Sequence, residues 1–100
     1  MPPGTQGPPL PIVTVVTHAA GVLDGDMDGE VVLMSAANGE YYALDAVAST
    51  LWRLTATPLT VGALCRGMCE RYEGSAETVT ADVLAFVRDL IQRGLLRIEA

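Results

Sequence analysis

The hydrophobic pattern of the chain changes its period once, at Asp45, and this change limits the folds available to it. Before Asp45, residues 12–17, 30–35 and 40–44 are rich in β-branched and aromatic side chains, as strands are. Asn38-Gly39, a strong hairpin signal, joins the second and third of these segments. The first part of the chain therefore predicts a small antiparallel sheet.

After Asp45 the apolar residues recur with the helical period of 3.6, in three successive segments. Three side chains are suited to cap the helix N-termini: Asp45, Thr60 and Ser75. Gly94 fits the position that follows the last helix, and we expect the apolar tail, residues 95–98, to pack back onto the domain. The predicted fold class is α+β, a three-stranded antiparallel sheet packed on three helices.

A length of 100 residues suits one domain, which we place at residues 12–98, after a Pro- and Gly-rich tail at residues 1–11 that we expect to be disordered. No apolar run approaches the ~20 residues that span a bilayer. The N-terminus has no basic and apolar regions of a secretory signal. Cys65 and Cys69 lie within or beside the apolar stripe of the second helix, which favours reduced core thiols. We therefore expect a cytoplasmic protein.

Candidate catalytic and metal-binding residues are few. The one histidine, His18, and the two cysteines supply at most three zinc ligands, without the spacing of a zinc site. Every second residue of the segment 24–30 is acidic, but the segment does not have the bidentate glutamate of a calcium loop. We therefore interpret it as a solvated loop. We expect no catalytic residue, no metal and no cofactor, which favours a binding module over an enzyme.

Three helices with a hairpin also describe a winged helix-turn-helix, a common DNA-binding shape, and a DNA-binding protein is one alternative. Charge opposes it, because the chain carries 12 acidic residues, 6 arginines and no lysine, a net charge of −6. The third helix is also mixed in charge. It carries Glu77, Asp82 and Asp89 against Arg88 and Arg93.

The remaining candidate site combines the edge of the third strand with the third helix. The apolar stripe of this helix is roughly 160° wide, broader than the ~100° needed to face a core. The stripe is either core throughout or lines a groove along one edge. The sequence does not determine which edge this is, and the edge that carries Phe86 is our candidate. On the strand, Tyr42 and Leu44 should face inward, and Tyr41 and Ala43 outward.

Several motifs resemble, in order and spacing, those of the PqqD-like peptide chaperones, also called RiPP recognition elements. The family acts on ribosomally made, post-translationally modified peptides. The resemblance covers about residues 12–98, with Leu44-Asp45 where the family often has Leu-Asn. The motifs are Asp28–Met34, Gly39–Asp45, Leu51-Trp52, Thr60-Val61, Asp82-Val83, Phe86 and Gly94-Leu95-Leu96. With no enzyme domain fused, the chain resembles the free-standing type that is typical of lasso-peptide clusters.

The resemblance implies a winged-helix-like β3α3 domain that binds the leader of a precursor peptide as an extra antiparallel strand on the third strand. It implies two partner enzymes, a transglutaminase-like leader peptidase and a lasso cyclase. The alternative within the family is a chaperone for a radical-SAM peptide-modifying enzyme. We expect a monomer that binds neither nucleic acid nor membrane, although a subunit of an obligate complex or a homodimer would use the same edge. The implied peptide-binding residues are Glu40, Tyr41, Tyr42, Ala43, Leu44, Val79, Asp82, Val83, Phe86, Leu90 and Arg93.

Overall fold

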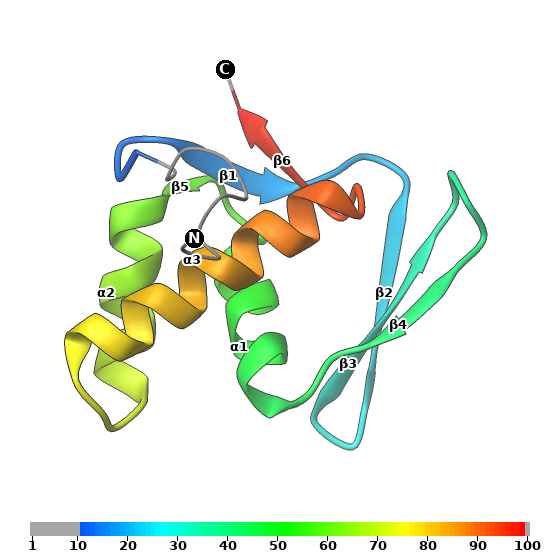
Figure 1. Ribbon diagram of the computed structural model, residues 1–100. Coiled ribbons are helices and arrows are strands. Elements are labelled where there is room, and N and C mark those ends of the chain that lie inside the picture. Colours follow the sequence, from blue (N-terminus) through cyan, green and yellow to red (C-terminus); the bar gives the residue numbers. More distant parts are fainter. Residues whose placement is uncertain (1–10, 100) are drawn as a thin grey trace, which may run out of the picture.

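The computed structural model describes residues 11–99, which form three helices and two small sheets (Figure 1). The expected tail, residues 1–11, lies outside the described residues except for Pro11. The strands are β1 (Val15–His18), β2 (Val22–Met27), β3 (Glu30–Ser35), β4 (Tyr41–Ala43), β5 (Leu59–Thr60) and β6 (Leu96–Glu99). The helices are α1 (Ala46–Leu54), α2 (Val61–Arg71) and α3 (Ala76–Gln92). The α+β class predicted from the change of period is confirmed.

One sheet is an antiparallel meander in the order β2-β3-β4. Asp28 and Gly29 join β2 to β3 with φ angles of 56° and 87°, and two positive φ angles are what a type I′ hairpin turn requires. Gly39, with φ 71°, lies in the turn between β3 and β4. The pairing of β3 with β4 confirms the hairpin predicted from Asn38-Gly39.

Strand β2 corrects the interpretation of residues 24–30 as a solvated loop. Asp and Gly are depleted in strands, so local propensity argued against a strand here. Tertiary contacts override that propensity. The indole N–H of Trp52 donates to Asp24 at 2.8 Å, and the guanidinium of Arg53 bonds to Asp26 at 2.6 Å. Hydrogen bonds from Gly29 N–H and from Arg53 lower the pKa of Asp26, so this carboxylate stays charged.

The second sheet has the order β5-β1-β6, and it corrects the placement of the first predicted strand. Residues 12–17 were expected beside the hairpin, but the strand begins at Val15 and pairs with β5 and β6 instead. The apolar tail packs back as expected and forms β6, antiparallel to β1. In Figure 1 this sheet lies across the top of the helices, and the meander lies to the right of α1.

The helix boundaries follow from local chemistry. All three predicted N-caps are confirmed, because each side chain accepts the backbone N–H three residues ahead: Asp45 from Ala48, Thr60 from Ala63 and Ser75 from Thr78. At the other end of α3, Gly94 has φ 75°, and the Leu95 N–H bonds back to the Leu90 carbonyl at 2.9 Å. This is a Schellman motif, as Gly94 predicted.

Ser49 of α1 fixes where β4 leaves its neighbour β3. The side chain is fully buried; its Oγ accepts the N–H of Val31 at 2.8 Å and donates to the carbonyl of Leu44 at 3.3 Å. Leu44 N–H also bonds to the Val31 carbonyl at 2.9 Å. One hydroxyl therefore holds the start of β3, the end of β4 and α1 together.

We predict that Ser49→Ala lowers the free energy of unfolding by about 1–3 kcal/mol, because it leaves the buried N–H of Val31 without a partner. Urea denaturation followed by circular dichroism measures the change. The control is Thr57→Ala, which removes an exposed hydroxyl and should change stability by less than about 0.5 kcal/mol. Equal urea midpoints for Ser49→Ala and the wild type would contradict the role given to Ser49.

Candidate functional site

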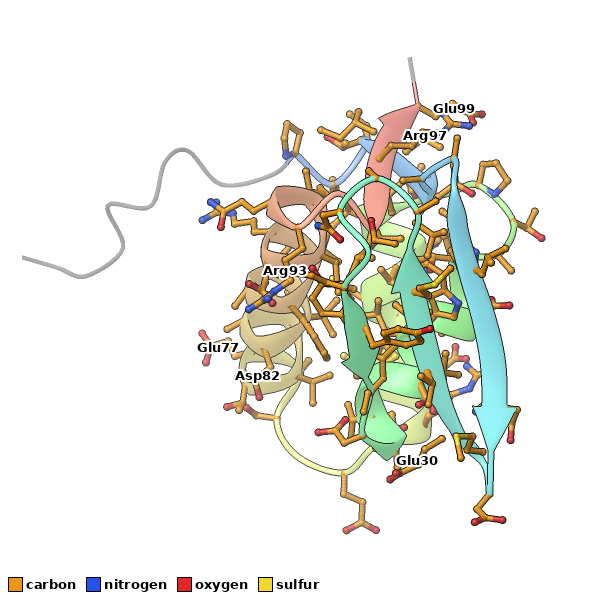
Figure 2. The ribbon with its side chains drawn as sticks, turned by 90° about the vertical axis from the view of Figure 1, so that its right-hand side faces the viewer. Glu30, Glu77, Asp82, Arg93, Arg97 and Glu99 are labelled. Atoms are coloured by element: carbon orange, nitrogen blue, oxygen red, sulfur yellow. The ribbon has the colours of Figure 1, made fainter. Side chains whose placement is uncertain are left out.

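A groove of about 470 Å³ lies between β4 and α3. Its walls are the edge strand, the start of α1 and the C-terminal half of α3. Figure 2 looks onto the meander, with α3 beside β4 in this view. The groove is lined by Tyr41, Tyr42, Ala43, Leu44, Asp45, Ala48, Phe86, Asp89, Leu90, Arg93 and Leu95.

Strand β4 forms one edge of the meander, and no other described strand pairs with its outer side. Ser35 N–H bonds to the Glu40 carbonyl at 3.0 Å, and Leu44 N–H bonds to the Val31 carbonyl at 2.9 Å. Backbone groups alternate in direction along an antiparallel strand, so those of Tyr41 and Ala43 point away from β3. These N–H and C=O groups are available to a further strand.

The side chains of β4 alternate as predicted. Leu44 is buried and Tyr42 is partly buried against the core, whereas Tyr41 is 73% exposed and Ala43 is also exposed. The groove therefore has an apolar floor beside an open backbone edge. Glu40 does not line the groove, but its carboxylate accepts a hydrogen bond from the Tyr42 hydroxyl at 2.8 Å.

The α3 stripe divides between core and groove. Its centre, Val83, Val87 and Leu90, is buried, whereas Phe86 on one edge is only partly buried and lines the groove. The stripe is thus not core throughout, and the side of Phe86 is the one that faces β4. The width of the stripe allows this division, but it does not by itself distinguish it from a stripe that is core throughout.

A second cavity, of about 290 Å³, begins on the other side of Phe86 and reaches the N-terminal half of α3. Val79, Asp82 and Val83 line this cavity and not the first groove. The structure thus places the predicted site residues of α3 in two neighbouring hollows that share Phe86.

Sequence reasoning missed several lining residues. Asp89 was recognisable from its spacing of four residues before Arg93, and Leu95 from its place after Gly94. Val47, which lines the second cavity, gave no such signal, because its role depends on how α1 packs against α3. The missed residues of the groove are Asp45, Ala48, Asp89 and Leu95.

Arg93 and Asp89 form an ion pair at one end of the groove. The Nε of Arg93 donates to the Asp89 carboxylate at 2.9 Å, and its guanidinium lies 5.6 Å from the centre of the Tyr42 ring. The hydrogen bond that Arg93 donates to the Asp89 carboxylate raises the pKa of Arg93 further above its usual value. Among the described residues, Arg93 is the only cation that lines either hollow.

The histidine and the cysteines make packing contacts within the fold. His18 Nε2 lies 2.8 Å from the Trp52 carbonyl oxygen, which can only accept, and its ring stacks on the indole at 3.5 Å. Cys65 is buried, and this burial raises the pKa of its thiol. Within residues 11–99, no group of three or more His, Cys, Asp or Glu residues could hold a metal ion. No helix of the described chain has the length and apolar character to cross a membrane.

Comparison with known proteins gives a family model and two solved structures. The model for coenzyme PQQ synthesis protein D (PqqD) matches residues 30–96. The structure of TbiB1 in complex with the TbiA(beta) leader peptide is 31% identical, with a TM-score of 0.77, over 84% of this chain and 98% of that one. A lasso peptide synthetase B1 complexed with the leader peptide shares the fold, at 18% identity and a TM-score of 0.73, over 82% and 96% of the two chains. No curated protein sequence matches the chain at a significant level.

We predict that iodoacetamide alkylates Cys69 of the native protein faster than Cys65. Cys69 is only partly buried, with its Sγ 4.0 Å from the Thr80 hydroxyl, whereas burial keeps Cys65 protonated and covered. Mass spectrometry of the digested protein measures both rates, and the same reaction in urea should make them equal. Equal rates in the native protein would contradict the difference in burial between Cys65 and Cys69.

Proposed function

The chain belongs to the PqqD family, and from this premise we propose that it is a non-catalytic receptor for the leader of a ribosomally made precursor peptide. The observation that carries the proposal is the open backbone edge of β4, which faces the partly buried Phe86 across the groove. A strand added to this edge gains main-chain hydrogen bonds from Tyr41 and Ala43, while alternate side chains enter the groove. We expect a dissociation constant in the micromolar to submicromolar range, about −8 to −10 kcal/mol.

The proposed setting is lasso-peptide biosynthesis. Two similarities support this setting over a partnership with a radical-SAM enzyme: that to TbiB1, solved with a leader peptide, and the fold shared with a lasso peptide synthetase B1 complexed with the leader peptide. The receptor would present the bound precursor to a leader peptidase and a cyclase. Because its ligand is a newly made ribosomal peptide, we place this function in the cytoplasm. We also expect the free protein to be a monomer.

Main-chain recognition predicts that Ala43→Pro abolishes peptide binding while the fold survives. Proline removes the outward N–H of Ala43, and the hydrogen bonds between β3 and β4 are made by the neighbouring residues. The matched control is Ala43→Val, which keeps this N–H and favours the strand. The ligand is a peptide of about 15 residues selected from a random display library against the full chain, and calorimetry measures its affinity. Wild-type affinity in Ala43→Pro would refute strand addition.

Because Phe86 is an apolar contact in the groove, we predict that Phe86→Glu, which places a charge there, lowers the affinity for the same peptide by at least tenfold. Phe86→Leu keeps an apolar side chain and should lose only a few-fold in affinity. Thermal unfolding of both variants shows whether the domain is intact. If Phe86→Glu folds and binds as the wild type does, the peptide lies elsewhere.

A further inference from the structure

The cavity beyond Phe86 extends the groove toward α1. Apolar side chains from α1, α2 and α3 form its walls, and Val47 among them is 44% exposed. Its volume of about 290 Å³ is roughly ten times that of a water molecule in the liquid, so it has room for a large side chain. The apolar wall residues are Val47, Leu51, Met68, Val79, Val83 and Phe86.

Carboxylates border this cavity. Glu73, in the link between α2 and α3, and Asp82 on α3 both line it and are exposed. Neither has an ion-pair partner among residues 11–99. The cation of the neighbouring groove, Arg93, is eleven residues along α3 from Asp82, which is about 16 Å at 1.5 Å per residue. The cavity end is therefore acidic, and the only lining cation of the described chain is at the far end.

The direction of β4 determines which part of a bound peptide meets this acidic end. Tyr42 lies near Arg93, and the chain then continues through Leu44 into α1, whose Val47 borders the cavity. β4 thus runs from the Arg93 end of the groove toward the cavity. A strand added antiparallel to β4 runs the opposite way, so its N-terminal part lies over the cavity.

We propose that Glu73 and Asp82, on the rim of this cavity, select a leader whose N-terminal part carries a lysine or arginine close to the large apolar side chain that occupies the cavity. The proposal rests on the proposed function and names the chemistry of the ligand. The apolar side chain excludes water from the cavity, and a nearby cation pairs with carboxylates that have no ion-pair partner in the described part of the chain. An acidic residue at the same place would be repelled, which gives selection against other peptides.

A second copy of the chain is a poorer occupant. The chain carries a net charge of −6 and no lysine, so two copies repel one another where an acidic rim would have to meet a partner. Light scattering during the binding experiment below distinguishes the two occupants, because a dimer at the concentration used would overturn the proposal.

The experiment compares peptide selection by three forms of the full chain. They are the wild type, the double variant Glu73→Gln/Asp82→Asn, and the control double variant Glu70→Gln/Glu77→Gln. The control removes the same charge from exposed residues that line neither hollow, and in Figure 2 Glu77 lies farther from the sheet than Asp82. Each protein selects from a random library of peptides of about 15 residues, and the enriched sequences are compared.

The wild type and the control should enrich peptides with a large apolar residue and a Lys or Arg within about three positions of it. The Glu73→Gln/Asp82→Asn variant should keep the apolar preference and lose the basic one. For a synthetic binder, changing its lysine to glutamine should weaken binding to the wild type about five- to tenfold near 50 mM salt, and much less near 500 mM. For the cavity variant the change should be less than about twofold.

Two outcomes of the peptide selection would also overturn the proposal. If the selected peptides depend on Phe86 for binding but all three proteins show the same preference for lysine or arginine, the proposed charge selection is wrong and the receptor function stands. If no selected peptide depends on Phe86, the proposed function and the inference both fail. Val47→Ser provides a second check, because it should weaken the apolar contact and leave the ratio between lysine and glutamine peptides unchanged.

Discussion

The indole of Trp52 joins parts of the fold that are not neighbours in the sequence. It is buried in α1, stacks on His18 of β1 with 10° between the rings, and donates its N–H to Asp24 of β2. One side chain thus ties both sheets to the central helix. One turn earlier, Ser49 ties the same helix to β3 and to the end of β4. The position of β4, and hence of the groove, depends on these contacts of α1.

The groove exists because, on both α3 and β4, some residues hold the element in the fold while others stay open to a ligand. On α3, Val83, Val87 and Leu90 are buried and hold the helix in the core, which leaves Phe86 partly open. On β4, the inward backbone groups pair with β3, while Asp45 caps α1 and directs the chain away from the edge. A ligand therefore meets surfaces that the fold has already ordered, so the cost of ordering on binding falls mainly on the peptide.

What could be predicted from the sequence was local. The Asn38-Gly39 hairpin, the helix caps and Gly94 depend on a few adjacent residues. The width of the α3 stripe indicated that one edge could line a groove, but it did not determine which edge. β2 could not be predicted this way, because contacts with Trp52 and Arg53, more than 25 residues away, offset its low strand propensity. β6 pairs with β1 from the opposite end of the chain, and the cavity at Val47 depends on helix packing.

The charge of the molecule is segregated in a way that bears on what a winged-helix shape can bind. Residues 46–99 carry six acidic residues and six arginines, so they are neutral, whereas residues 22–45 carry six acidic residues and no arginine. Five of these six acidic residues lie in the strands and turns of the meander, Glu30 among them (Figure 2), and Asp26 pairs there with Arg53, while the sixth, Asp45, caps α1. A nucleic acid would be repelled by this hairpin. The main chain of a peptide carries no charge, so it can pair with β4 despite the acidic residues of the protein. Those residues then attract or repel only the charged side chains of the peptide.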